Sequence, residues 1–265
     1  VNKDYYTSYN NLGLYYDRIG NKEEAFIQYQ KCLKLEPNYP NALNNIGLIY
    51  FYYEDNNKAF DCFYKALKID PHMVDLYFNL GHTYFKLKDF KKAEIWFDKG
   101  FKIDPNNING HYNYAFLLLA LQDYKKAWIE YDYRLKRSTV INNELTYDNI
   151  KNKIWNGEDL NNEKILVLRE QGVGDEILYS SMYEELNHLN QNVYFESDPR
   201  LLSIFNRSFK IKLFPVFTFS KNKKKLKDFN KITFAGSLGK FLRQKKEKFS
   251  KKRRYLIPDK EIVNK

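Results

Sequence analysis

Residues 45–71 read NIGLIYFYYEDNNKAFDCFYKALKIDP, and three features of this stretch recur at a fixed distance along the chain. Its glycine, one of its alanines and its proline each have counterparts 34 residues away. The sets are Gly13, Gly47, Gly81 and Ala115; Ala25, Ala59, Ala93 and Ala127; and Pro37, Pro71 and Pro105. The chain therefore contains an internal repeat, and each repeat is one structural unit.

The period of 34 residues predicts a helical fold, because a small residue in one helix, alanine in the next and proline at the exit are the tetratricopeptide pattern. The small residues allow the two helices of a repeat to approach closely, and proline ends the second helix. We expect large aromatic residues to fill the space between repeats: Tyr29, Phe63, Phe97 and Tyr131. Four repeats, over residues 1–137, should stack into a superhelix with a concave surface.

An asparagine column accompanies the repeat: Asn11, Asn45, Asn79 and Asn113 are also 34 residues apart. This position on the first helix of each repeat should lie near the concave surface. A side-chain amide offers both a donor and an acceptor, so a column of amides can pair with the backbone of an extended peptide. The alternative is that asparagine is simply a common residue at this position in such repeats.

The pattern changes after a predicted connector at residues 138–160. Residues 161–265 contain apolar runs that read as strands and alternate with helical spacing, as in KILVLRE (164–170), NVYFES (192–197), KIKLFPV (210–216) and KITFAG (231–236). A single helix is expected over residues 175–190. Alternating strands and helices imply a parallel sheet, so we predict a Rossmann-like half domain and an α plus α/β chain overall.

The sequence QGVGDE, residues 171–176, lies where the first predicted strand leads into a helix, at the sheet edge where ligands collect in such folds. It lacks the third glycine of a dinucleotide fingerprint and carries two acidic residues, which argues against NAD or FAD. Gln171, Gly172 and Gly174 could bring backbone N–H groups to a substrate beside the Asp175 carboxylate. Alternatively, Asp175 only caps the helix.

The distribution of charge along the chain limits the classes of molecule that it is expected to bind. Residues 1–147 hold 19 basic and 18 acidic side chains, whereas residues 148–265 hold 25 and 15, so the net charge of +11 is concentrated in the second part. Residues 210–254 alone carry 17 basic and 2 acidic side chains. This stretch could attract phosphates or an anionic surface, or it could be a solvated helix face. It lacks the regular aromatic interleaving of a single-strand binder, so nucleic acid is not the expected partner.

Several classes of site are not expected. The two cysteines, Cys32 and Cys62, lack metal or disulfide spacing and suit a reducing, cytoplasmic environment. The four histidines are scattered, so no metal or cofactor is expected. No apolar run of about 18 residues exists to span a bilayer. The chain begins with Val1 and lacks a signal-like apolar segment, which predicts a fragment of a longer protein.

The order of elements resembles bacterial tetratricopeptide proteins fused to a glycosyltransferase-like domain of the GT-B type, related to the O-linked N-acetylglucosamine transferases and heptosyltransferases. The matching residues are Trp155 and Gly157, EQGVGD at 170–175, DPRL at 198–201, SLG at 237–239 and YL at 255–256. The asparagine column is similar to the one that lines the acceptor groove in those transferases. Many relatives carry an Arg-Tyr pair where this chain has Ser181 and Met182, so a contact made by that arginine is in doubt.

The resemblance implies that the first lobe supplies acceptor contacts, while a second lobe, expected to be missing here, holds the nucleotide-sugar. The parent protein would transfer a sugar to a protein or glycan hydroxyl, with Asp175 or Glu170 as the carboxylate that orients or deprotonates it. The fragment itself would be inactive. The alternative is a non-catalytic tetratricopeptide scaffold whose repeats bind a peptide or protein partner.

Overall fold

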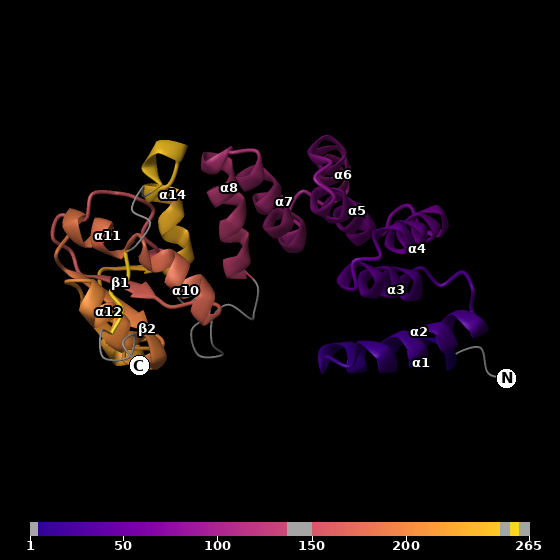
Figure 1. The fold of residues 1–265 in the computed structure, drawn as a ribbon, viewed down its shortest axis with the longest axis horizontal. Coiled ribbons are helices and arrows are strands. Elements are labelled where there is room, and N and C mark those ends of the chain that lie inside the picture. Colours follow the sequence, from indigo (N-terminus) through magenta and orange to yellow (C-terminus); the bar gives the residue numbers. More distant parts are fainter. Residues whose placement is uncertain (1–4, 137–149, 250–254, 260–265) are drawn as a thin grey trace. The chain divides into compact units, whose positions relative to one another are not determined.

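The computed structural model describes residues 5–136, 150–249 and 255–259. The chain divides into two compact units, Val1–Leu117 and Leu118–Lys265 (Figure 1). The first unit contains antiparallel helix pairs and the second contains a parallel sheet with its helices. The repeat period predicts that the repeats extend to residue 137. In the structure the chain divides after Leu117, so the second helix of the fourth repeat packs with the sheet unit.

Helix pairs with the predicted 34-residue period form the first unit. The pairs are α1 (Tyr5–Arg18) with α2 (Lys22–Leu35), α3 (Pro40–Tyr52) with α4 (Asn56–Ile69), and α5 (Val74–Lys86) with α6 (Phe90–Ile103), followed by α7 (Ile108–Ala120). Each of these second helices ends shortly before the proline that recurs every 34 residues, because proline cannot continue the hydrogen-bonding ladder. The tetratricopeptide prediction is confirmed for these helices.

The small residue of each first helix lies against the large aromatic of its own second helix. A Cβ atom added to Gly47 would come within 2.5 Å of the Phe63 ring, and one added to Gly81 within 3.1 Å of Phe97. Phe63 and Phe97 are fully buried. The missing side chain of glycine leaves room for each ring. The same rings also pack between repeats, as expected: Phe63 shares a buried core with Leu76 and Leu80 of the next repeat, and the Phe97 ring lies 5.3 Å from that of Tyr114.

The turn between the paired helices also repeats, a feature that the sequence analysis missed. Gly20, Glu54, Lys88 and Gln122 all have positive φ, between 62° and 84°. The residue after each of them caps the second helix by accepting a backbone N–H of the first turn: Asn21, Asp55, Asp89 and Asp123. The Asn or Asp that recurs every 34 residues is the sequence signal for these caps, because both residues are favoured at the start of a helix.

A four-stranded parallel sheet forms the core of the second unit, in the order β3-β2-β1-β4. The strands are β1 (Ile165–Leu168), β2 (Val193–Ser197), β3 (Lys212–Pro215) and β4 (Lys231–Phe234). In β1 all four residues are buried, as expected for a central parallel strand. All four predicted strands are present, and their order is that of the first strands of a doubly wound sheet. Such a sheet serves many functions, so it does not by itself indicate a glycosyltransferase.

Helices and 3-10 turns complete the second unit. They are α8 (Tyr124–Tyr131), η1 (Asp132–Lys136), η2 (Lys151–Lys153), α10 (Val173–Ser180), α11 (Tyr183–Leu189), η3 (Pro199–Leu201), α12 (Leu202–Ser208), α13 (Lys223–Leu226), η4 (Ala235–Leu238), α14 (Gly239–Leu242) and η5 (Lys246–Lys248). The single helix predicted over 175–190 is two helices. The hydroxyls of Ser180 and Ser181 bond the carbonyls of Ile177 and Leu178, and such bonds compete with helix continuation.

The predicted connector lies partly outside the described residues. Its described end runs along the edge of β4, where Trp155 N donates to the Ile232 carbonyl at 2.9 Å. The Trp155 ring is buried against Phe241, with ring centroids 4.4 Å apart. Gly157 has φ of +93° and a Cβ there would meet Phe241, so glycine is required at this position.

The close packing inside each repeat leads to a first prediction. Gly47→Ala should lower the free energy of unfolding of the first unit by about 1–3 kcal/mol, because the new methyl group collides with the buried Phe63 ring. Calorimetric unfolding of the full chain would measure this. Gly174→Ala is the matched control, since no atom lies within 4 Å of its added Cβ. Equal effects of the two substitutions would contradict the proposed packing.

Candidate functional site

The asparagine column forms part of a hydrogen-bonded ladder between first helices. Asn45 Nδ2 donates to Asn10 Oδ1 at 3.1 Å, and Asn79 Nδ2 donates to Asn44 Oδ1 at 2.8 Å. The acceptors Asn10 and Asn44 are only 4% and 6% exposed. Each bond satisfies a buried amide of the preceding repeat, so Asn45 and Asn79 have a structural role whether or not they bind a partner.

The two ends of the column lack this structural bond. Asn11 is exposed and Asn113 is half-buried. Within the described residues, neither side chain has a hydrogen-bond partner. Asn11 and Asn113 are therefore the members of the column whose amides are available to a ligand without disturbing the ladder.

Apolar side chains lie beside the asparagines. One helical turn after each asparagine, on the same helix face, come Leu14, Leu48, His82 and Phe116. Leu14 and Leu48 are 38% and 40% exposed. Burial, with a smaller effect of Lys86, lowers the pKa of His82, so this imidazole is uncharged at neutral pH. Four side chains of low polarity thus accompany the amides.

Charged side chains on this face are few. Extending it by one turn in either direction adds Arg18 on α1, and Asp75 and Lys86 on α5. Lys86 Nζ lies 3.2 Å from the Glu54 carboxylate and 4.8 Å from the centre of the Phe51 ring, so this cation is already engaged. We call the positions of α1, α3, α5 and α7 that carry the asparagines and their apolar neighbours the amide face.

The QGVGDE turn lies where predicted, between β1 and α10 at the carboxyl edge of the sheet. Gly172 is the N-cap of α10, and its backbone N–H donates to Asp175 Oδ2 at 3.2 Å. Gly172 and Gly174 are exposed and Asp175 is half-buried. Asp175 therefore contributes to capping, the alternative considered from the sequence, although it occupies the third helical position rather than the cap itself. A catalytic role for Asp175 stays a prediction.

Gln171 and Tyr131 lie together in the second unit. Gln171 has φ of +60°, and its Nε2 atom lies 3.2 Å from the Tyr131 hydroxyl. That hydroxyl also lies 2.5 Å from the hydroxyl of Tyr179, a residue that is buried. The side chain of Gln171 is thus held by the end of α8, and its role in substrate binding is untested.

Glu170 occupies a fully buried network with Arg134. Arg134 Nε and Nη2 donate to the two carboxylate oxygens at 2.9 and 2.5 Å, and Gly236 N donates to Oε1 at 2.6 Å. Burial opposes the charge of Arg134, but Glu170 and then Asp132 raise the pKa of the guanidinium above its ordinary value. A carboxylate engaged in this way is poorly suited to removing a proton from a substrate, and a catalytic role for Glu170 stays a prediction.

A second acidic and basic network crosses the carboxyl edge, and the sequence analysis did not find it. Arg169 Nε donates to Glu176 at 2.8 Å, and its Nη2 atom lies 3.2 Å from Asp198. Arg200 bonds Asp198 with two nitrogens and thereby lowers the pKa of the Asp198 carboxyl. Asp198 belongs to the DPRL motif, which was the available signal. The charges at this edge largely neutralise one another.

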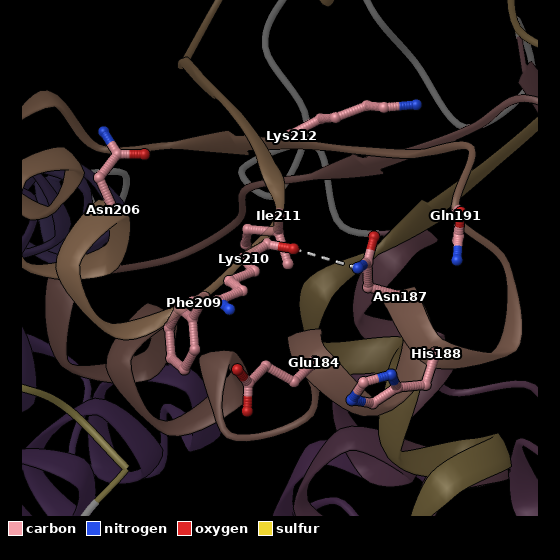
Figure 2. Close-up of a pocket in the computed structure, with 9 residues that line it drawn as sticks. All are labelled: Glu184, Asn187, His188, Gln191, Asn206, Phe209, Lys210, Ile211 and Lys212. Atoms are coloured by element: carbon pink, nitrogen blue, oxygen red, sulfur yellow. Dashed lines mark hydrogen bonds between the residues drawn. The ribbon is translucent and has the colours of Figure 1, made fainter.

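A hollow of about 750 Å³ lies at the opposite edge of the sheet, where α11 leads into β2 and α12 leads into β3. Figure 2 shows its mainly polar lining, with Asn187 Nδ2 donating to the Lys210 carbonyl at 3.2 Å. None of the residues predicted from the sequence lines it. Ligands of parallel sheets bind at the carboxyl ends of the strands, so this hollow is not our candidate site.

The described residues include neither a reactive thiol nor a metal-binding cluster. Burial raises the pKa of Cys32 and Cys62 to about 11, so both free thiols stay protonated at neutral pH. No group of three or more His, Cys, Asp or Glu side chains in the described part of the chain could hold a metal ion. None of the helices described here is long and apolar enough to cross a membrane.

Comparison with known families identifies repeats in the first half of the chain. Models described as tetratricopeptide repeat match residues 6–39, 40–73, 74–107 and 96–129. A comparison with curated proteins found no match.

Solved structures similar to this chain include MamA (21% identity, 49% of this chain and 76% of that chain, TM-score 0.42) and PilF of Pseudomonas aeruginosa (20%, 51% and 62%, 0.45). A third is the first tetratricopeptide domain of Spaghetti (RPAP3), bound to the HSP90 peptide SRMEEVD (21%, 46% and 98%, 0.43). Each covers about half of this chain.

The buried network predicts a large stability effect. Glu170→Gln should lower the free energy of unfolding of the second unit by about 3–5 kcal/mol, because the buried Arg134 would keep only the partly exposed Asp132 as a counter-charge. Urea unfolding followed by the fluorescence of Trp128 and Trp155 would measure it. The control Arg200→Gln removes a side chain that is 74% exposed and should cost at most about 1 kcal/mol. A small effect of Glu170→Gln would contradict the structural role.

Proposed function

We propose that this chain, whose residues 6–129 are a tetratricopeptide-repeat array, captures an extended and uncharged peptide segment on its amide face. The observation that carries the proposal is the pairing of two columns on the first helices, one of asparagines and one of exposed or half-exposed apolar residues. Backbone pairing supplies affinity and the apolar column supplies side-chain selectivity, as in other modes of extended-peptide recognition.

The geometry of packed helices sets the length of the ligand. Helices in contact lie roughly 8–10 Å apart, and an extended chain rises about 3.3 Å per residue, so each repeat corresponds to roughly three residues of peptide. Four first helices then accommodate a segment of about ten residues. One amide for every three residues of bound peptide can pair with the backbone of many sequences, so the amide face should accept peptides of varied sequence.

Charge sets the class of peptide. The amide face and the turns that extend it hold two cations, Arg18 and Lys86, on helices separated by two repeats, and Lys86 is paired with Glu54. The uncharged His82 and the leucines offer no positive charge to a carboxylate. A neutral segment with apolar side chains therefore fits better than an acidic peptide, because buried carboxylates without partners cost free energy.

The test is selection of peptides from a random 15-residue library on the full chain, followed by titration of a selected peptide by fluorescence anisotropy. We expect neutral, apolar-rich sequences, and we expect Asn11→Ala with Asn113→Ala to weaken binding about 10- to 100-fold through the loss of two amide contacts. Asn38→Ala with Asn57→Ala, which changes exposed asparagines outside the amide face, should leave binding unchanged.

The peptide SRMEEVD, seen in the Spaghetti structure, serves as an acidic probe and should bind much more weakly than the selected peptides. Preferential binding of this peptide would contradict the proposed selectivity. Unchanged affinity of the Asn11 and Asn113 double variant would show that the amide face is not the binding surface.

Asn45 and Asn79 differ from the two end members of the column. A purely ligand-binding role of these two asparagines predicts that their replacement by alanine weakens capture without unfolding the repeats. The ladder revises this expectation, because Asn45→Ala and Asn79→Ala each leave a buried amide oxygen unpaired, at a cost of about 1–3 kcal/mol. Thermal unfolding should therefore detect these variants even if peptide binding does not change.

A second candidate is sugar transfer by a longer protein in which the sheet unit forms one lobe. The observation in its favour is the exposed Gly172 and Gly174 turn at the carboxyl edge of a parallel sheet. A nucleotide-sugar would be the donor and a hydroxyl of a protein or glycan the acceptor. The engagement of Glu170 and the capping bond of Asp175 make this candidate weaker than peptide capture.

Asp175 distinguishes the two candidates. Asp175→Asn keeps an oxygen that can accept from Gly172 but removes the negative charge, so stability should change by at most about 1 kcal/mol. Transfer by a chain that carries a second lobe should then fall about 100-fold or more if the carboxylate acts as a base. Retained transfer would assign Asp175 to capping alone.

A further inference from the structure

An exposed phenylalanine projects from the loop that follows β3. Phe217 is 44% exposed and adopts φ of 71°, a conformation that is uncommon for a bulky residue. Its neighbour Phe219 is partly buried against the hydrophobic core that contains Phe229 and Leu226. The loop thus buries one aromatic ring and presents the other to solvent.

Hydrogen bonds hold this loop in place. The buried Glu196 carboxylate, on β2, accepts the backbone N–H groups of Phe219 and Ser220 at 2.6 and 2.9 Å. On the other side of Phe217, the Val216 N–H donates to the Ser197 carbonyl at 2.7 Å. The loop that carries the exposed ring is consequently anchored on both sides of the ring. The loop is therefore already ordered before a partner binds.

One lysine lies over the exposed ring and three more follow it in the chain. Lys221 Nζ lies 4.2 Å from the centre of the Phe217 ring. Lys224, Lys225 and Lys227 follow on α13 and just after it, and all four side chains are exposed. Within the described residues none of the four has a carboxylate partner. Residues 216–230 contain 5 lysines and a single acidic residue, Asp228, so this segment is strongly positive.

We propose that Phe217 and these four lysines form a docking surface for an anionic lipid bilayer. An apolar ring inserts into the interfacial region, while flexible ammonium groups around it match a diffuse negative surface. Lysine is suited to this task because it acts as a mobile point charge, whereas recognition of individual carboxylates or phosphates favours the bidentate fork of arginine. A nucleic acid would need several stacking rings, and this surface exposes one. The proposal is independent of peptide capture by the repeats.

The test is co-sedimentation of the full chain with vesicles of phosphatidylcholine containing about 30% phosphatidylglycerol at roughly 0.1 M salt. We expect binding that disappears with pure phosphatidylcholine and weakens at roughly 0.5 M salt. Phe217→Ala should reduce the partition coefficient about tenfold, because much of the ring's apolar transfer is lost. Lys221→Glu, Lys224→Glu and Lys225→Glu together should reduce it more than about 100-fold, at roughly fivefold for each lysine.

The control makes the same change of net charge elsewhere. Lys34→Glu, Lys68→Glu and Lys102→Glu alter three exposed lysines at equivalent positions of the repeats and should change binding by less than about threefold. Phe217→Trp should retain binding, and its fluorescence should shift to the blue on addition of anionic vesicles. Circular dichroism verifies that each variant folds.

Three results would overturn the proposal. One is failure of the wild-type chain to sediment with anionic vesicles at low salt. Another is equal loss of binding in the two triple lysine variants, which would indicate attraction by net charge alone. The third is lysine-dependent binding to a single-stranded oligonucleotide without binding to vesicles, which would assign the surface to nucleic acid.

Discussion

The buried pairing of Arg134 with Glu170 holds three parts of the second unit together. Both side chains are fully out of solvent, and the remaining bonding groups of the guanidinium reach Asp132 and the Ser237 hydroxyl. Breaking such a network leaves a buried charge, so only an arrangement that brings η1, the end of β1 and η4 together is tolerated. This condition fixes the end of α8 against the carboxyl ends of β1 and β4, and it explains why the last repeat helix packs as part of the sheet unit.

The same network determines what the carboxyl edge can offer. Glu170 is neutralised by Arg134, while Glu176 accepts from Arg169, the Ser197 hydroxyl and Asp198 N. What remains open is backbone at Gly172 and Gly174 together with one carboxylate that already accepts a capping bond. Acidic residues at a sheet edge suggest catalysis when read from sequence, but here most of their oxygen atoms serve to orient the loops that follow the strands.

Periodicity made the fold of the repeats predictable, because the glycine, alanine and proline positions repeat with one spacing and each has one physical reason. The four strands were also predictable from short apolar runs between helical segments. The break at Ser181 and the pairing of Glu170 with Arg134 were not, because each depends on how side chains pack once the chain has folded. Glu170 and Arg134, in particular, are separated by the connector, and nothing in their local sequence indicates that they meet.

The amide ladder connects stability to recognition in the repeats. Asn10 and Asn44 are buried, and each obtains its hydrogen bond only when the next first helix is correctly placed. The bond therefore fixes the register of neighbouring first helices, and with it the spacing of the apolar residues that lie one turn further along. A rigid surface of this kind loses little conformational entropy on binding, so modest contacts can hold an extended chain. The asparagines of the ladder are the least available to a ligand, but they hold the amide face in the shape that a ligand requires.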